Sequence, residues 1–553
     1  MREFMRDIRK IPEFIIYLQE RENMSKENFI KGAAILSIAG LFVKILGAVY
    51  RIPLTNLIGT EGIGHYQPAY NIYNLLLVVS LSGFPTAIAK MVSERRALNN
   101  YQGAYQVYKI ARWGLFLIGL ISSIFVLLFA RNLVTFLGFP GSYYSMLSLV
   151  PALFAVPLLS VYRGFFQGMQ NMTPIAMSQL IEQIFRVAVG LYLAYAFVDT
   201  GLEEAAAGAT FGASAGGIAA LLLIYVMFFF SKKKVREEIL LSRNNRTEPV
   251  QDVIRSLLYI AVPITIGASI APLMGNLDSL IVSNRLAAIG YTVEEYTDMF
   301  GELSGTAQTL INFPQVFSTA VAMSLVPSIT EAFTKKQVKR LNQTANAGVK
   351  MSLIIGLPCG IGLFMLAEPI IALLYPSIGQ AKHASSGALL EIMSIGVIFL
   401  TLVQAFTAIL QSVNKQFHPV KNLALGMVIK VFLSYVLIGI PDINIKGAAI
   451  STTVAYLFVA IFNLYDINKT KIKISLIKVS SRALLSTAIM ALTVWISFRF
   501  LLSAGISQRL ATLGSIAGAV IVYAVCLFVT GTITQEDLEL IPKGEKLSRF
   551  VRK

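Results

Sequence analysis

The fold of this protein is decided by a pattern that is clearest in residues 162–190, YRGFFQGMQNMTPIAMSQLIEQIFRVAVG. A short polar turn, QGMQN, separates the end of one apolar block from the start of the next. The second block is long enough to cross the roughly 30 Å hydrocarbon core of a bilayer as a helix. It nevertheless carries Glu182 and Arg186, which are four residues apart and therefore share one face of that helix. The stretch indicates a membrane-spanning hairpin with charges inside it.

The same pattern extends along the whole chain. Of its 553 residues, 55% are hydrophobic and only 14% are charged, against about 25% charged residues in ordinary soluble domains. The apolar blocks have the length of helical spans, and none shows the alternating segments of about 10 residues that form membrane β-barrels. We therefore predict an all-α polytopic membrane protein with fourteen transmembrane helices. They are expected near residues 30–50, 68–89, 110–130, 145–162, 174–198, 206–230, 256–277, 306–329, 349–373, 388–410, 420–440, 447–465, 483–501 and 510–531.

The charged residues lie mainly in the segments between these blocks. The net charge of +17 is concentrated in alternate segments, which include Lys232–Arg236, Lys335–Arg340 and the tail KGEKLSRFVRK, whereas several of the intervening segments are acidic. Cytoplasmic loops of membrane proteins carry an excess of Lys and Arg. The pattern predicts that the N-terminus and the C-terminus are both cytoplasmic. It also accounts for the positive net charge without a nucleic-acid partner.

A weak internal repeat divides the first twelve spans into six and six. GFPTAIAKMVSE ends the second span much as STAVAMSLVPSITE ends the eighth, and Arg186 and Lys430 fall at matching depths in spans five and eleven. Transporters use such repeats to face each other across a central site. We predict a cytoplasmic N-terminal segment (1–28), a first six-helix bundle (29–230), a cytoplasmic linker (231–255), a second, related six-helix bundle (256–468), two extra transmembrane helices (469–531) and a basic cytoplasmic tail (532–553).

Ionisable residues at membrane depth or at its edges are the candidate functional residues, because a charge at the bilayer centre costs about 2.5–3.5 kcal/mol. Two are acidic, Glu182 and Asp278, and are candidates to form ion pairs or to bind a coupling cation. The basic candidates are Lys44, Arg51, Arg163, Arg186, Arg285 and Lys430. Their surplus of positive charge suits an anionic cargo, since Arg in particular binds phosphate oxygens in a bidentate manner. The alternative for each is a structural ion pair or a side chain that reaches the membrane interface.

Motifs for enzymatic chemistry are missing from the sequence. It contains no GxxxxGK[ST], HExxH or CxxC, and its three histidines and two cysteines are scattered. We therefore expect a transporter without a cofactor or a metal site. An ion gradient or the membrane potential, worth about 2.3 kcal/mol per charge per 100 mV, is the expected energy source.

The opening stretch resembles the span-four-to-five motif of the polysaccharide-transport branch typified by stage V sporulation protein B and YtgP. This branch belongs to the multidrug/oligosaccharidyl-lipid/polysaccharide exporter superfamily. FVKILGAVYRIPLTNLIG, GFPTAIAKMVSE, APLMGNLDSLIVSNRL and MSLVPSITEAF extend the resemblance over nearly the whole chain. The count of six, six and two spans is similar to that of MurJ-type lipid II flippases, whose two extra helices form a groove for the prenyl tail.

The resemblance implies a flippase of the bacterial plasma membrane. Its cargo would be lipid II, which is linked to undecaprenyl pyrophosphate, and membrane lipids would surround it. Lys44 falls where MurJ-type proteins carry a span-one arginine, and Arg51 falls within one residue of a second. The second span here lacks the arginine of those proteins, and we expect Arg186 and Lys430 to supply the missing charge.

We therefore predict alternating access between the two bundles. Lys44, Arg51 and Arg186 would hold the pyrophosphate, and the prenyl tail would lie along spans thirteen and fourteen. Three other functions stay open: export of another lipid-linked polysaccharide or of a teichoic acid precursor, drug/cation antiport, and membrane glycan polymerisation.

Overall fold

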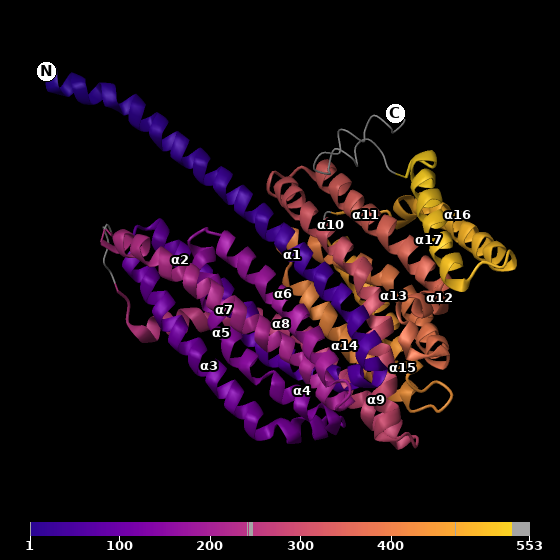
Figure 1. Ribbon diagram of the computed structural model, residues 1–553. Coiled ribbons are helices and arrows are strands. Elements are labelled where there is room, and N and C mark those ends of the chain that lie inside the picture. The colour runs from indigo at the N-terminus through magenta and orange to yellow at the C-terminus, as the bar shows by residue number, and fades with distance from the viewer. Residues whose placement is uncertain (1, 241, 243–246, 471, 533–553) are drawn as a thin grey trace.

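The computed structural model describes residues 2–240, 242, 247–470 and 472–532, and its regular elements there are all helices (Figure 1). In chain order they are α1 (Arg2–Val78), η1 (Val79–Gly83), α2 (Phe84–Ala97), α3 (Tyr101–Phe136), η2 (Pro140–Ser142), α4 (Tyr143–Ser148), α5 (Val150–Gly168), α6 (Thr173–Phe197), α7 (Leu202–Leu240), α8 (Val250–Ala288), α9 (Val293–Gly301), η3 (Glu302–Ala307), α10 (Gln308–Thr334), α11 (Val338–Met365), α12 (Ala367–Leu374), η4 (Pro376–Ile378), α13 (Gln380–Ser412), α14 (Phe417–Ile438), α15 (Lys446–Asn468), α16 (Leu476–Ser503) and α17 (Gln508–Val529). The predicted all-α, multi-span fold is confirmed.

Within the described ranges, thirteen helices are long and apolar enough to cross a membrane, against the fourteen spans predicted. The difference lies in α1, which contains the first predicted span and the start of the second. Gly59 inside α1 has φ 71° and ψ −178°, a conformation that glycine adopts without a Cβ penalty. Arg51 contacts Gln67, although sixteen residues of straight helix would place them about 24 Å apart. The chain therefore folds back at Gly59, and α1 supplies two antiparallel segments.

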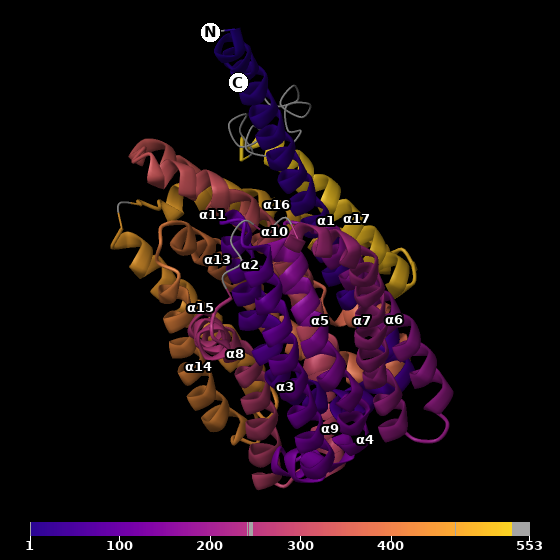
Figure 2. The ribbon, with the colours of Figure 1, turned by 90° about the vertical axis from the view of Figure 1, so that its left-hand side faces the viewer.

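The helices pack in an order that repeats between α1–α7 and α8–α15. In the first half, α6 packs against α7, α1 against α6, and α3 against α5. The corresponding pairs in the second half are α14 with α15, α8 with α14, and α11 with α13. Figure 2 looks onto the first of these halves and shows α8 beside α14. The packing order is what an internal repeat would produce.

The predicted domain boundaries at residues 28, 230, 255, 468 and 531 stay predictions. Much of the predicted linker, residues 231–255, is helical, because α7 continues to Leu240 and α8 begins at Val250. Of the predicted tail at residues 532–553, all but the first residue lies outside the described part of the chain.

The two ends of the molecule differ in how the halves meet. We call the end at which α1 begins and α17 ends the termini side, and the opposite end, with α9, the far side (Figure 1). Gly59 belongs to the far side, because its neighbour Thr60 contacts Asp298 of α9. At the far side one hydrophobic core joins both halves: Phe139, which follows α3, packs against Tyr296 and Phe300 of α9 with ring centroids 5.6 and 5.1 Å apart. At the termini side there are two cores: the one around Tyr108 joins the first half to Val253, Leu257 and Ala261 of α8, and the one around Phe406 contains no residue of the first half.

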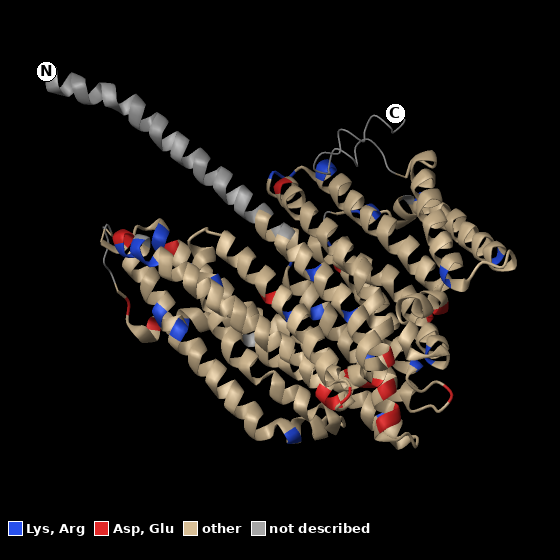
Figure 3. Cartoon of the chain, viewed as in Figure 1, with Lys and Arg blue, Asp and Glu red and all other residues tan. Residues whose placement is uncertain are grey.

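Acidic residues gather on and around α9 at the far side (Figure 3). They include Glu294, Glu295 and Asp298, which belong to one of the segments predicted to be external. The orientation of the chain in the membrane, with both termini cytoplasmic, stays a prediction.

Candidate functional site

Two adjoining cavities lie between the halves, each of about 490 Å³. They share four lining residues, Gln67, Ser304, Gln308 and Gln315, and we call them together the central chamber. One cavity is bordered by α1 and α10, and the other extends between α8, α10, α13, α14 and α15. The chamber therefore touches helices of both halves.

The α1 wall of the chamber is cationic. Lys44 and Arg51 both line it, and their spacing of seven residues puts them on one face of α1. The Lys44 side chain is exposed. The Arg51 guanidinium contacts the Gln67 carboxamide and lies 4.7 Å from the centroid of the Tyr66 ring, while its Nη1 is buried without a hydrogen-bond partner. This wall offers a fixed guanidinium group with unused donor capacity, which suits an anion.

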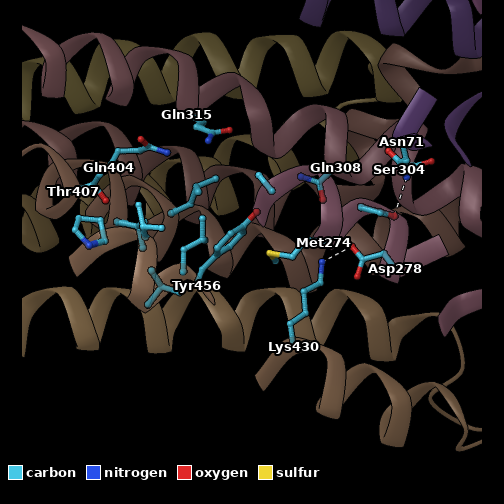
Figure 4. A pocket seen from close by; sticks show the side chains of 18 of the residues that line it. Asn71, Met274, Asp278, Ser304, Gln308, Gln315, Gln404, Thr407, Lys430 and Tyr456 are labelled. Carbon is cyan, nitrogen blue, oxygen red and sulfur yellow. Dashed lines mark hydrogen bonds and ion pairs between the residues drawn. The ribbon is translucent and has the colours of Figure 1, made fainter. Parts of the chain in front are cut away.

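The opposite wall holds an ion pair. Lys430 of α14 donates to the Asp278 carboxylate of α8, and both residues line the chamber beside Met274 and Tyr456 (Figure 4). Lys430 is buried, and the Asp278 side chain is 24% exposed. The pair therefore places two neutralised charges at the edge of the chamber.

A third group of lining residues consists of uncharged amides. Gln308, Asn312 and Gln315 come from α10, and Gln404 and Gln411 come from α13. They were not predicted from the sequence, because an uncharged amide in an apolar block is less conspicuous than a charge. The signal was present, since Gln308, Asn312 and Gln315 are spaced by four and three residues and Gln404 and Gln411 by seven, so each set lies on one helix face.

Glu182 lies in a separate cluster inside the first half. Its carboxylate accepts hydrogen bonds from Arg163 Nη2 at 2.9 Å and from Arg186 Nη2 at 2.7 Å. Arg163 Nε also donates to Ser178 Oγ at 2.9 Å. None of these residues lines the two cavities of the central chamber. The cluster carries one surplus positive charge, and its ion pairs join α5 to α6.

The eight predicted site residues thus fall into four places. Lys44 and Arg51 share the cationic wall, Asp278 and Lys430 form the ion pair, and Arg163, Glu182 and Arg186 form the cluster of the first half. Arg285, in the last turn of α8, lines neither cavity and lies 4.3 Å from the centroid of the Tyr435 ring. The structure does not bring Arg186 to Lys44 and Arg51 at the chamber wall.

Polar contacts close the far side beyond the chamber. The Asn56 amide donates to the Leu374 carbonyl oxygen at 2.7 Å, and the Ser377 hydroxyl donates to the Asn56 carbonyl oxygen at 2.7 Å. Lys382 Nζ donates to Thr60 Oγ1 at 2.9 Å and pairs with Asp298 at 2.7 Å. Burial raises the pKa of Tyr375 well above its usual range, so its hydroxyl stays a donor to the Gly305 carbonyl oxygen at 3.2 Å. These contacts tie the Gly59 turn to the second half.

Known protein families and individual proteins are similar to this chain in sequence. Residues 29–333 match the family described as polysaccharide biosynthesis protein, and residues 304–436 match the family described as MatE. Stage V sporulation protein B of Bacillus subtilis (strain 168) is 30% identical over 94% of this chain and 98% of its own length. The lipid II flippase MurJ of the same organism is 29% identical over 77% of this chain and 80% of its own length.

Solved structures share the fold. A structure described as lipid II flippase MurJ in an inward closed conformation has a TM-score of 0.64 at 16% identity and covers 90% of this chain and 98% of its own. An inward-facing multidrug resistance MATE family transporter also has a TM-score of 0.64, at 13% identity over 78% of this chain and 98% of its own.

These matches confirm the resemblance of the motif at residues 162–187. The apolar helices and the relatives together identify a multi-pass protein of the bacterial plasma membrane. Because one family pattern covers more than half of the chain and a relative at 30% identity aligns with nearly all of it, the chain belongs to the polysaccharide biosynthesis protein family.

Proposed function

We propose that this protein is a flippase that moves a lipid-linked cell-wall precursor, lipid II, from the inner to the outer leaflet. The observation that carries the proposal is the cationic wall, where Lys44 and Arg51 face a chamber between two helical halves. A pyrophosphate is the part of the cargo that such a wall would bind, because guanidinium and ammonium groups form charge-assisted hydrogen bonds with phosphate oxygens. The relatives named for lipid II transport support the same substrate class.

Movement of the cargo would use alternating access. Several helices of both halves share one hydrophobic core at the far side, whereas at the termini side only α8 of the second half joins the core of the first half, and the core around Phe406 contains no residue of the first half. Such an arrangement favours entry of cargo from the termini side, which is the predicted cytoplasmic side. Release would require the contacts of Asn56, Thr60 and Lys382 at the far side to break while new contacts form at the termini side.

The Asp278–Lys430 pair is the group that we propose for coupling. It joins α8 to α14 at the edge of the chamber, so a change in the spacing of these helices would change the pairing. Protonation of Asp278 or its release to bind a cation would then link the conformation to an ion gradient. Glu182, already held by two arginines, is the weaker candidate for the same role.

The prenyl tail would lie along α16 and α17. These helices pack against α11 and α12 through an apolar cluster that includes Leu366, Met490 and Tyr523. Many of their remaining large apolar side chains are exposed, as contact with lipid requires. A tail on this surface would keep the cargo attached to the membrane while its head group occupies the chamber.

A second candidate cargo is another lipid-linked polysaccharide. The observation that favours it is the 30% identity to stage V sporulation protein B along nearly the full chain. The cationic wall and the tail surface would serve such a cargo equally well, since the pyrophosphate and the prenyl chain are common to both.

Depletion of the protein in its host tests the proposal. Lipid II in the outer leaflet would be measured with an externally added toxin that cleaves lipid II. We expect accessible lipid II to fall and precursor to accumulate inside the cell. Unchanged accessibility in a strain that lacks other flippases would contradict lipid II as the cargo.

A further inference from the structure

Two rows of polar side chains, one on α10 and one on α13, line the central chamber. Gln308, Asn312 and Gln315 are spaced by four and three residues on α10, and Gln404, Thr407 and Gln411 are spaced by three and four residues on α13. Each set therefore lies along one helix face. α10 and α13 pack against each other, so the two rows adjoin. Figure 4 shows Gln308, Gln315, Gln404 and Thr407 along the cavity. We call these six residues the carboxamide wall.

Most of this polar capacity is not used by the protein. Gln308 donates to Asn312 at 3.3 Å, and Thr407 accepts from Asn463 at 3.4 Å. Within the described parts of the chain, the side chains of Gln315, Gln404 and Gln411 form no hydrogen bond to protein. Gln315 and Gln404 are half-buried and Gln411 is exposed, so each offers two donor hydrogens and an acceptor oxygen to whatever fills the chamber. These groups must therefore be hydrated or bound to a ligand.

The chemistry of the wall selects an uncharged partner. Carboxamides carry no net charge and both donate and accept, which matches the hydroxyl and amide groups of sugars and peptides. Across the cavity, α8 and α14 present Ala271, Met274, Val420 and Leu423, an apolar surface for ring faces and methyl groups. Gln404 and Gln411 are separated by two helical turns, about 10 Å, so the wall has room for a short oligosaccharide.

The wall is continuous with the cationic wall. Gln67, Gln308 and Gln315 line both cavities, and Gln67 contacts Arg51. From there the α13 row runs toward the termini side, because α13 ends there at Ser412. A cargo with its pyrophosphate at Arg51 would therefore place the next chemical group along the carboxamides.

We propose that the carboxamide wall binds the uncharged, hydroxyl- and amide-bearing glycan of the cargo, while Lys44 and Arg51 bind its pyrophosphate. The inference rests on the proposed function and names which residues recognise which part of the substrate. It assigns selectivity for the glycan to α10 and α13.

The test compares two probes, lipid II and undecaprenyl pyrophosphate, which lacks the disaccharide and the peptide attached to it. Their Kd values would be measured on the purified full-length protein in lipid nanodiscs. The variant Gln315→Leu/Gln404→Leu removes two carboxamides at nearly constant volume. We expect its Kd for lipid II to rise about 10-fold, as the loss of one or two hydrogen bonds implies, and its Kd for undecaprenyl pyrophosphate to stay within about 2-fold.

Matched variants distinguish a loss of glycan binding from a general disruption of the protein structure. Gln315→Asn/Gln404→Asn keeps the carboxamides and should retain more of the lipid II affinity than the Leu variant, whereas Lys44→Gln should weaken both probes. Equal weakening of both probes by the Leu variant, or none, would overturn the inference while leaving the proposed function intact. Failure of the unmodified protein to bind either probe would overturn the proposed function and, with it, this inference.

Discussion

Lys430 is a buried ammonium group whose contact with Asp278 neutralises it at the edge of the chamber. A buried ion pair contributes little net stability compared with a well-packed apolar pair, but removing one partner leaves an uncompensated charge. The same asymmetry makes the pair suited to coupling transport to an ion gradient. If Asp278 lost its charge, either α8 and α14 would have to move or Lys430 would need a new partner.

The variant Asp278→Asn tests the pair at the level of single residues. Loss of one partner from a buried pair costs about 3–5 kcal/mol, and we expect the lower end because Asp278 is 24% exposed. The double variant Asp278→Asn/Lys430→Met removes both charges and should recover much of that loss. Thermal unfolding in detergent measures both. A single variant as stable as the unmodified protein would show that Lys430 is not held by Asp278.

Single residues also decide how much of the site could be predicted. Lys44, Arg51, Asp278 and Lys430 were predicted because a charge inside an apolar block is costly and therefore conspicuous. Arg186 was expected to hold the pyrophosphate with Lys44 and Arg51, but it lines neither cavity of the chamber. It does pair with Glu182 on the same helix face, as its spacing indicated. Spacing along one helix shows which residues share a face, but not which neighbouring helix that face meets.

At the level of elements, glycine determines how closely α6 and α7 pack. A Cβ added at Gly216 of α7 would lie 2.3 Å from the Glu182 carbonyl oxygen, and one at Gly212 would lie 2.4 Å from the Arg186 carbonyl oxygen. Small residues allow such close approach of membrane helices. The packing of α7 therefore fixes the backbone that carries the Glu182 cluster.

Gly216→Ala is expected to destabilise the protein more than Gly59→Ala. At Gly216 the two backbones must separate, whereas at Gly59 the added Cβ meets open space and the cost is the backbone conformation, which is almost confined to glycine and costs another residue about 1–3 kcal/mol. Gly114→Ala, in α3 with open space around it, is the matched control and should be neutral or slightly stabilising. The melting temperature should be lowest for Gly216→Ala, higher for Gly59→Ala and highest for Gly114→Ala. Equal losses of stability in the Gly216 and Gly114 variants would contradict the close contact between α6 and α7.

The positions of the helices were easier to predict from the sequence than the turns and breaks between them. Each predicted span lies in one to three helical elements, because an apolar block of about 20 residues has few alternatives in a bilayer. The sequence did not reveal that helical structure continues around Gly59, or that the fourth and ninth spans divide into α4 and α5 and into α11 and α12. Local backbone geometry of this kind depends on tertiary contacts.

At the level of the whole molecule, the far-side contacts hold the halves in one of two required arrangements. Asn56→Cys/Ser377→Cys, in a chain with Cys359 and Cys526 replaced by Ser, would cross-link the Gly59 turn to the second half, because Ser377 Oγ and Asn56 Oδ1 are 2.9 Å apart. We expect oxidation to stop lipid II transport in proteoliposomes and reduction to restore it.

A cross-link within one half provides the control. Ser434→Cys/Ser451→Cys would join α14 to α15, whose hydroxyl oxygens are 2.6 Å apart, without bridging the halves. Transport should survive this cross-link. If the far-side cross-link also left transport unchanged, the far side would not need to open, and alternating access between the halves would be wrong.

The measurement that tests the central claim most directly is lipid II transport by the purified protein in liposomes, with leaflet exposure read by an external lipid II-cleaving toxin. We predict that the unmodified protein and Lys109→Gln, an exposed lysine on α3 outside the chamber, expose lipid II at similar rates. Lys44→Gln/Arg51→Gln should lower the rate at least about 10-fold, since each lost charge-assisted hydrogen bond is worth about 1.5–3 kcal/mol. Transport by the double variant at the unmodified rate, in protein that folds normally, would contradict the account.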